Sequence, residues 1–271
     1  MPDTAAKLLG QPLKTPIMVA PMCNSVANTG GGLTERELVT ALVSGSHLAG
    51  SLGWIGDPAD EGLFADAISA VENTGRGVVI IKPRLDHDNI MERFTLAEKA
   101  GAVAVGLDID GAGLLLMKLK GQAVGPKTRD QIAELARATR LPFIVKGIMT
   151  VDEAVICAEA GVSAIVVSNH GGRVLDQTPG TAAVLPEIAR EVHGKVTVLV
   201  DGGVRSGVDA LKMLALGAAG VLVGRPLLVG AYGAGAEGVR FLLEKYTAEL
   251  YAAMILTGCP SLAEISPRIL A

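Results

Sequence analysis

Short aliphatic segments alternate with longer helix-like segments along the whole of this 271-residue chain, and this alternation is its most restrictive feature. The aliphatic segments are rich in Val, Ile and Ala, which is typical of strands buried on both faces of a parallel sheet. The intervening segments have the length and apolar spacing of amphipathic helices. The expected strands are Pro16–Ala20, Ala49–Ile55, Val78–Lys82, Val103–Asp110, Phe143–Gly147, Ala164–Asn169, Val196–Asp201 and Gly220–Gly224. The expected helices are Thr34–Leu48, Leu63–Asn73, Asn89–Ala100, Thr128–Thr139, Thr150–Ala160, Ala182–Val192, Gly207–Leu216 and Glu237–Thr257.

Eight uninterrupted strand–helix units predict an α/β fold, a single (β/α)8 or TIM barrel. The alternative is a doubly wound open sheet, which normally carries a GxGxxG turn after its first strand. Here Pro21-Met22-Cys23-Asn24 follows the first expected strand, with no such turn. Because no Pro/Ser-rich linker or charge block interrupts the pattern, residues 1–271 are expected to form one domain.

Charge and cysteine content narrow the partners. A net charge of −4 gives no basic surface for nucleic acid, so none is expected as a partner. The three cysteines are far apart in the sequence, which favours a reducing, cytoplasmic setting over a disulfide framework. No leader is predicted, because Met1 to Thr15 has no basic region followed by an apolar core. No membrane span is predicted, because the longest apolar stretch, 218–236, contains Arg225-Pro226 and many glycines.

Polar residues gather where the expected strands end, and that is where barrels place their chemistry. Consecutive glycines let backbone N–H groups approach an anion, and the helix that follows adds its positive end. The pair of turns after the last two strands therefore predicts a phosphate site, although ordinary glycine turns with surface arginines would look alike. The strand-end residues are Asp108 and Asp110, Lys146, Ser168 to Arg173, Asp201 to Arg205, and Gly224-Arg225.

Lys146 and His170 are the candidate reactive side chains. Lys146 ends a strand that should be buried, where an unpaired ammonium is costly, so it needs an electron-rich partner, such as a flavin edge or a substrate carboxylate. A lysine that extends to solvent is the alternative. Two glycines after His170 leave room for a ligand, and Arg173 adds a positive charge. Asp110 is placed to orient the imidazole as a base.

Several of these motifs occur in the same order in one known family. On them the chain resembles the FMN-dependent 2-hydroxy-acid oxidase and dehydrogenase family, which includes glycolate oxidase and lactate oxidase. The match is dense from about residue 141 to 262, and it is strongest to a compact bacterial branch. The motifs are Val145-Lys-Gly-Ile148, Ser168-Asn-His-Gly-Gly-Arg173, Leu175-Asp176, Asp201-Gly-Gly-Val-Arg205, Ala215-Leu-Gly-Ala218 and Gly224-Arg-Pro226.

The resemblance implies a role for each candidate. FMN would be the cofactor, and a small 2-hydroxy acid would lose two electrons at C2 to give a 2-keto acid. His170 would be the base with Asp110 as its partner, and Arg173 would bind the substrate carboxylate. Lys146 would balance the charge of the reduced flavin. Ser168 and Asp108 would lie at the flavin ring, and Asp201, Gly202, Gly203, Arg205, Gly224 and Arg225 would hold its phosphate end.

The chain also departs from the family. The family uses two active-site tyrosines, one before the barrel and one at the end of the third strand. Here every tyrosine, Tyr232, Tyr246 and Tyr251, follows the eighth strand. Lys82 stands near the third-strand position, and Asp108 stands where a threonine usually contacts flavin. The family's N-terminal segment, which helps to cover the barrel mouth, is also expected to be missing.

Three hypotheses follow from these residues. The leading one is an FMN oxidoreductase of a 2-hydroxy acid, with Lys82 or Lys118 replacing lost substrate contacts. The second is another phosphate-binding barrel, such as an FMN-dependent isomerase or a nucleotide dehydrogenase, and the latter lacks its cysteine after the sixth strand. The third is a flavin-binding barrel without turnover. Relatives tend to be tetramers or larger, which implies a homo-oligomer, and no metal site is expected.

Overall fold

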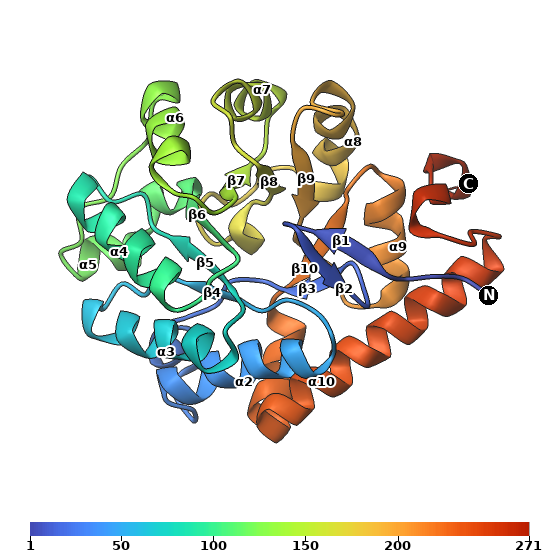
Figure 1. The fold of residues 1–271 in the computed structure, drawn as a ribbon, viewed down its shortest axis with the longest axis horizontal. Helices are drawn as coiled ribbons and strands as arrows, with labels where there is room; N and C mark the ends of the chain where they lie inside the picture. The colour runs from blue at the N-terminus through green and yellow to red at the C-terminus, as the bar shows by residue number, and fades with distance from the viewer. Residues whose placement is uncertain (271) are drawn as a thin grey trace.

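The barrel strands form a closed ring. In a computed structural model, which describes residues 1–270, eight parallel strands pair in the order β3-β10-β9-β8-β7-β6-β5-β4. A parallel bridge between Met22 and Ile55 joins the two outer strands, so the expected (β/α)8 barrel is confirmed (Figure 1). Residue 271, the end of the expected domain, lies outside the described range. The strands are β3 (Ile17–Val19), β4 (Trp54–Gly56), β5 (Val78–Ile81), β6 (Ala104–Asp108), β7 (Phe143–Ile148), β8 (Ala164–Val167), β9 (Thr197–Val200) and β10 (Gly220–Val223).

A hairpin that the sequence analysis did not predict closes the end of the barrel where the strands begin. Its strands, β1 (Ala6–Leu8) and β2 (Gln11–Leu13), pair antiparallel. Leu8 and Leu13 are buried in one apolar cluster with Met18 and Trp54 of the barrel strands. Each hairpin strand has only three residues, too few to show a clear alternating pattern.

Helices cover the outside of the ring and begin close to the expected positions. Thr150 begins α7 with a capping box: its hydroxyl accepts from the Glu153 N–H, and the Glu153 carboxylate accepts from the Thr150 N–H. Two short helices, α1 (Ser25–Thr29) and α5 (Leu115–Leu119), were not expected. The covering helices are α2 (Glu35–Leu48), α3 (Phe64–Thr74), α4 (His87–Lys99), α6 (Arg129–Ala138), α7 (Val151–Glu159), α8 (Thr181–Glu191), α9 (Gly207–Ala215) and α10 (Arg225–Leu256).

Helix α10 starts twelve residues before its expected start at Glu237, because Arg225 already begins a helical turn. A kink at Ala234 and Gly235 joins this first part to the expected helix. The early start places Gly224 at the N-terminus of a helix, next to the mouth of the barrel. α10 then runs along α2 and α9, as Figure 1 shows in orange.

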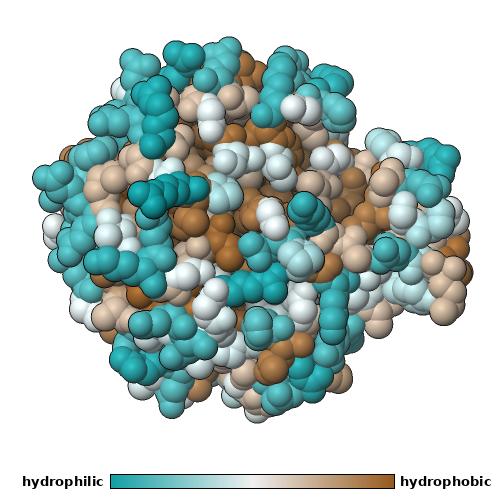
Figure 2. Space-filling view, in the orientation of Figure 1, coloured by the Kyte–Doolittle hydropathy of each residue, from teal (hydrophilic) through white to brown (hydrophobic). Residues whose placement is uncertain are grey.

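The two ends of the chain lie side by side. The Asp3 N–H donates to the Pro260 carbonyl at 2.9 Å, and both termini lie at one edge of the molecule (Figure 1). On the face of the molecule that is turned to the viewer in Figure 1, Figure 2 shows hydrophilic residues over the outer rim and hydrophobic residues toward the middle. No helix within residues 1–270 combines the length and the apolarity that crossing a membrane requires.

Candidate active site

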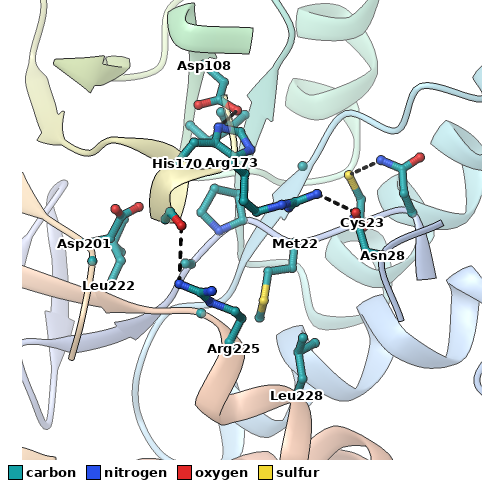
Figure 3. Close-up of a pocket in the computed structure, with 18 of the residues that line it drawn as sticks. Met22, Cys23, Asn28, Asp108, His170, Arg173, Asp201, Leu222, Arg225 and Leu228 are labelled. Atoms are coloured by element: carbon teal, nitrogen blue, oxygen red, sulfur yellow. Dashed lines mark hydrogen bonds and ion pairs between the residues drawn. The ribbon is translucent and has the colours of Figure 1, made fainter. Parts of the chain in front are cut away.

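A cavity of about 630 Å³ opens at the carboxyl ends of the barrel strands. Its size is within the range of small-molecule and cofactor sites. Ala20, directly after β3, Ile80 on β5 and Leu222 on β10 give it an apolar floor. Charged side chains lie around this floor, several of them drawn in Figure 3. They are Lys82, Asp108, Lys146, His170, Arg173, Asp201, Arg205 and Arg225.

His170 enters the cavity from a left-handed turn directly after β8. His170 has φ 55°, and Gly171 and Gly172 continue with φ 65° and 75°, a conformation that side chains other than glycine rarely adopt. The imidazole Nδ1 lies 2.9 Å from Asp110 Oδ1. Gly147 gives Asp110 its place, because a Cβ at 147 would lie 2.9 Å from the Asp110 carboxyl carbon.

Asp108 is the centre of a buried charge network. Its carboxylate accepts from Lys146 Nζ at 3.2 Å and from Lys82 Nζ on its other oxygen. Lys146 Nζ also donates to Ser168 Oγ at 2.9 Å and lies 3.5 Å from Asp201. The expectation that Lys146 has an electron-rich partner is thus met by the protein itself, before any ligand is considered.

These neighbours move the pKa values apart. Burial opposes ionisation of Asp108, but Lys146 and Lys82 outweigh it and hold the pKa of Asp108 well below its ordinary value. Burial and the charge of Asp108 raise the pKa of Asp110. Burial alone would lower the pKa of His170, but the charge of Asp108 and the hydrogen bond with Asp110 raise it.

Arg173 extends over the cavity toward α1. Its guanidinium donates to Asn28 Oδ1 at 2.6 Å, a contact drawn in Figure 3. The start of α1, the helix that carries Asn28, is held in place because the Glu35 carboxylate accepts from the N–H groups of Asn24 and Ser25. An arginine at the mouth with its fork toward the cavity is suited to a carboxylate ligand.

The opposite wall of the cavity has the form of an anion cradle. Within residues 1–270, the N–H groups of Gly203 and Val204 have no hydrogen-bond partner. The space beside Gly203 is open, because a Cβ there would have nothing within 4 Å. Arg205 and Arg225 flank the cradle, and α10 begins at its edge. Free N–H groups, guanidinium groups and a helix N-terminus together favour a phosphate.

These residues fit FMN. The cradle supplies donors for a phosphate, the apolar floor suits a flat ring system, and Lys146 supplies a buried ammonium at the edge of that floor. The cavity is long enough to include both the cradle and His170 among its lining residues.

Two predicted site residues lie behind the cavity wall. Ser168 is fully buried, and its hydroxyl accepts from the His170 N–H at 3.2 Å as well as from Lys146. Asp110 touches the cavity only through His170. Asp108 does line the cavity. Contacts of Ser168 and of Asp108 with a flavin stay predictions.

The structure disfavours the substrate contacts predicted for Lys82 and Lys118. The Lys82 ammonium is paired with Asp108, which disfavours its use as a substrate contact. Lys118 is exposed on α5 and does not line the cavity. No tyrosine of residues 1–270 lines it either, and the Tyr232 hydroxyl bonds to Ser25 and Thr29 of α1.

The sequence analysis missed the residues that α1 brings to the mouth. Asn28 and Cys23 line the cavity, and burial raises the pKa of the Cys23 thiol well above its usual range, so the thiol stays protonated. The signal for α1 was the stretch Asn24 to Gly32, which ends in three glycines with positive φ. It is too short to show helical periodicity.

Comparison with known proteins places the chain. A model of the family described as FMN-dependent dehydrogenase matches residues 112–271. The peroxisomal (S)-2-hydroxyacid oxidase GLO3 of Arabidopsis thaliana is 32% identical over 97% of this chain and 80% of its own length. The 2-hydroxyacid oxidase 2 of Rattus norvegicus is 47% identical over 52% of this chain and 40% of its own length.

Solved structures agree with this placement. A crystal structure of mandelate oxidase superimposes with a TM-score of 0.81 at 31% identity, and the match covers 96% of this chain and 80% of that one. A second, of mandelate oxidase with benzoyl-formic acid, gives a TM-score of 0.80 at 32% identity over 96% of this chain and 79% of the other. Because the family model covers more than half of the chain and the Arabidopsis oxidase matches 97% of it at 32% identity, the chain belongs to the FMN-dependent dehydrogenase family, a family of FMN oxidoreductases.

Proposed function

We propose that this protein oxidises a small 2-hydroxy acid to the 2-keto acid with bound FMN, and that His170 is the base. The relatives named as 2-hydroxyacid oxidases support this reaction. One observation carries the proposal: a single cavity is lined by His170, by Arg173 and by the anion cradle. A base, a carboxylate site and a phosphate site in one cavity are what this reaction requires.

His170 is suited to accept the substrate proton at Nε2. Its Nδ1 is engaged by Asp110, which fixes the ring and leaves the other nitrogen toward the cavity. Asp110 stabilises the imidazolium that forms when the proton arrives. When bound, FMN accepts the two electrons that leave substrate C2.

Arg173 positions the substrate through its carboxylate. The guanidinium is exposed at the mouth and already holds an oxygen, that of Asn28, at 2.6 Å. A substrate carboxylate replaces or joins this contact as a stronger, charged acceptor. The C2 hydroxyl group is then brought to the His170 side of the cavity.

The cofactor is held at two ends. Gly202, Gly203, Arg205 and Arg225 supply the phosphate end, and Lys146 lies at the ring end beside Ser168 and Asp201. Gly202 is confined to glycine, because its φ is 101° and a Cβ would lie 2.8 Å from the Thr181 hydroxyl. These residues would hold the flavin ring over the apolar floor on the side of the cavity that His170 lines.

The first prediction tests the base. His170→Ala is expected to slow anaerobic reduction of bound FMN by about 10²-fold or more, which is the contribution expected of a general base. The absorbance of oxidised flavin is followed after mixing with a panel of 2-hydroxy acids. FMN affinity should remain, since the phosphate cradle is untouched.

His193→Ala is the matched control, because His193 is not among the cavity residues. Unchanged reduction kinetics in His170→Ala would remove His170 as the base. If the unmodified protein binds FMN but no 2-hydroxy acid reduces it, the barrel binds flavin without this turnover, an outcome that the absence of a tyrosine from the cavity makes worth testing.

We also infer that the protein works in the cytoplasm as a homo-oligomer of four or more copies. The three cysteines are unpaired, which suits a reducing compartment. Val229, Phe241 and Leu256 of α10 are exposed apolar side chains that a subunit contact would cover. Light scattering on the purified protein measures the assembly, and a monomer mass would contradict it.

A further inference from the structure

Three cationic or ionisable groups converge on the Asp108 carboxylate. Lys146 and Lys82 each donate to one of its oxygens, and His170 Nδ1 lies 3.4 Å from the oxygen that Lys82 holds. The Asp108 side chain is 5% exposed. Nδ1 of His170 therefore faces two carboxylates, Asp110 at 2.9 Å and Asp108 behind it.

Burying Asp108 is costly unless its charge is compensated. Lys146 alone compensates it only in part, because Lys146 also faces Asp201 at 3.5 Å. Lys82 supplies the remaining positive charge. Its stem lies against Gly111, where a Cβ would be only 2.8 Å from Lys82 Cδ, and its backbone N–H donates to the buried Asp57. Lys82 is thus built into the wall toward Asp108.

The two departures noted in the sequence are therefore one paired feature. Lys82 ends β5 and Asp108 ends β6, and these strands are neighbours in the ring. Lys82 without Asp108 would be a buried charge without a counter-charge, and Asp108 without Lys82 would keep only Lys146, which it shares with Asp201. Together they form a buried ion pair that touches the proposed base.

We propose that Asp108 is a positioning residue for His170, and that Lys82 is the counter-charge of Asp108 rather than a substrate contact. This inference rests on the proposed function only in taking His170 as the base. Asp108 faces the same nitrogen of the imidazolium as Asp110, Nδ1, and adds a second negative charge there. Lys82 limits that effect, since its ammonium opposes a second positive charge on His170.

The surroundings of His170 support these opposing roles. The charge of Asp108 raises the pKa of His170, and the charge of Lys82 lowers it. The other charged groups come from every neighbouring element. They are Asp110 after β6, Lys146 on β7, Arg173 on its own turn, Asp201 after β9, and Arg225 at the start of α10.

The test is a titration of His170 in the FMN-loaded protein by NMR with labelled histidine. His170→Gln assigns the resonance among the four histidines. Asp108→Asn, which keeps the shape of the side chain, is expected to shift the His170 midpoint to lower pH. Lys82→Met is expected to shift it to higher pH, because Asp108 keeps Lys146 and stays ionised. The double variant should fall between the two.

Shifts of opposite sign separate this role from a general loss of structure, which would move both variants alike. Asp130→Asn, at an exposed position on α6, is the matched control and should leave the midpoint in place. Equal shifts in one direction, or none, would overturn the proposal. If Asp108→Asn does not fold, Lys82→Met alone decides, since an unchanged midpoint contradicts the counter-charge role.

The titration needs no turnover, so it is independent of the proposed reaction. Opposite shifts in a protein that oxidises no 2-hydroxy acid would leave the Asp108–Lys82 unit in place and overturn the proposed function alone. With turnover, the acid limb of the kcat/KM profile should move with the NMR midpoint in each variant.

Discussion

His170 carries opposite demands in this site. As the proposed base it must be neutral before it meets the substrate, yet Asp108 and Asp110 favour its charged form. Oδ2 of Asp110 is buried without a hydrogen-bond partner, and burial and the charge of Asp108 raise the pKa of Asp110. The pair shares protons closely, so its titration belongs to the pair and not to one residue.

The second prediction concerns pH. Because the pKa of His170 is raised, the neutral base forms only above the ordinary histidine range, near 6.5. The rate of anaerobic flavin reduction at low substrate concentration should therefore rise with pH through this raised pKa and fall below it. A rate that is flat from pH 5 to about 8 would contradict the prediction.

Stability follows the opposite sign. A histidine whose folded pKa is raised contributes stability that is fully present below its unfolded pKa and is lost as pH rises through the folded pKa. The protonated form that strengthens the folded state is the form that cannot accept a proton. His170 therefore gives activity and stability optima that lie apart.

At the scale of elements, one close approach fixes how α9 meets α10. A Cβ at Gly207 would lie 2.2 Å from the Leu250 nitrogen and 2.2 Å from the Tyr246 carbonyl oxygen. Both are backbone atoms of α10, so no side-chain rotation relieves the clash. The first turn of α9, which follows the phosphate cradle directly, can sit against α10 only without a side chain.

The third prediction follows from this contact. Gly207→Ala is expected to destabilise the fold by about 1–3 kcal/mol, as overpacking does, and to lower Tm. Gly233→Ala is the matched control, because Gly233 lies in the first part of α10 with open space around it. Thermal unfolding followed by circular dichroism measures both, and equal Tm values would show that α10 simply moves away.

The same elements show what the sequence could predict. The strands could be predicted from their aliphatic runs and the covering helices from their apolar spacing. His170, Asp110 and Arg173 could be predicted because they stand in motifs that occur in the same order in the family. The hairpin and α1 could not be predicted, because they are held by distant partners: Leu8 by the barrel interior and Asn28 by Arg173. The pairing of Lys82 with Asp108 depends on neighbouring strands, which only the closed ring establishes.

For the whole molecule, cofactor and fold are linked. A ligand that binds only the folded state adds stability that grows with its concentration, about 2.7 kcal/mol at one hundred times Kd. Here FMN would join the cradle after β9 and β10 to the charges at the ends of β6 and β7. Loss of the cofactor should therefore loosen the part of the barrel from β6 to β10 more than the part from β3 to β5.

The fourth prediction uses the phosphate end to measure this linkage. Excess FMN should raise Tm more than excess riboflavin, which lacks the phosphate. Arg225→Ala should reduce that difference, while the smaller effect of riboflavin stays the same, because a guanidinium that lines the cavity is a strong partner for a phosphate and riboflavin has none. Arg240→Ala, on the exposed face of α10, is the control.

The hairpin at the closed end of the barrel affects how substrate and product reach and leave the cavity. Because Leu8 and Leu13 close the end where the strands begin, the substrate enters and the keto acid leaves through the same doorway, past Arg173 and Asn28. The 2-hydroxy acid and the 2-keto acid both carry a carboxylate, so they would compete for the same place at this entrance. Arg173, the proposed carboxylate site, would therefore be both the first group that the substrate meets and the last that the product leaves.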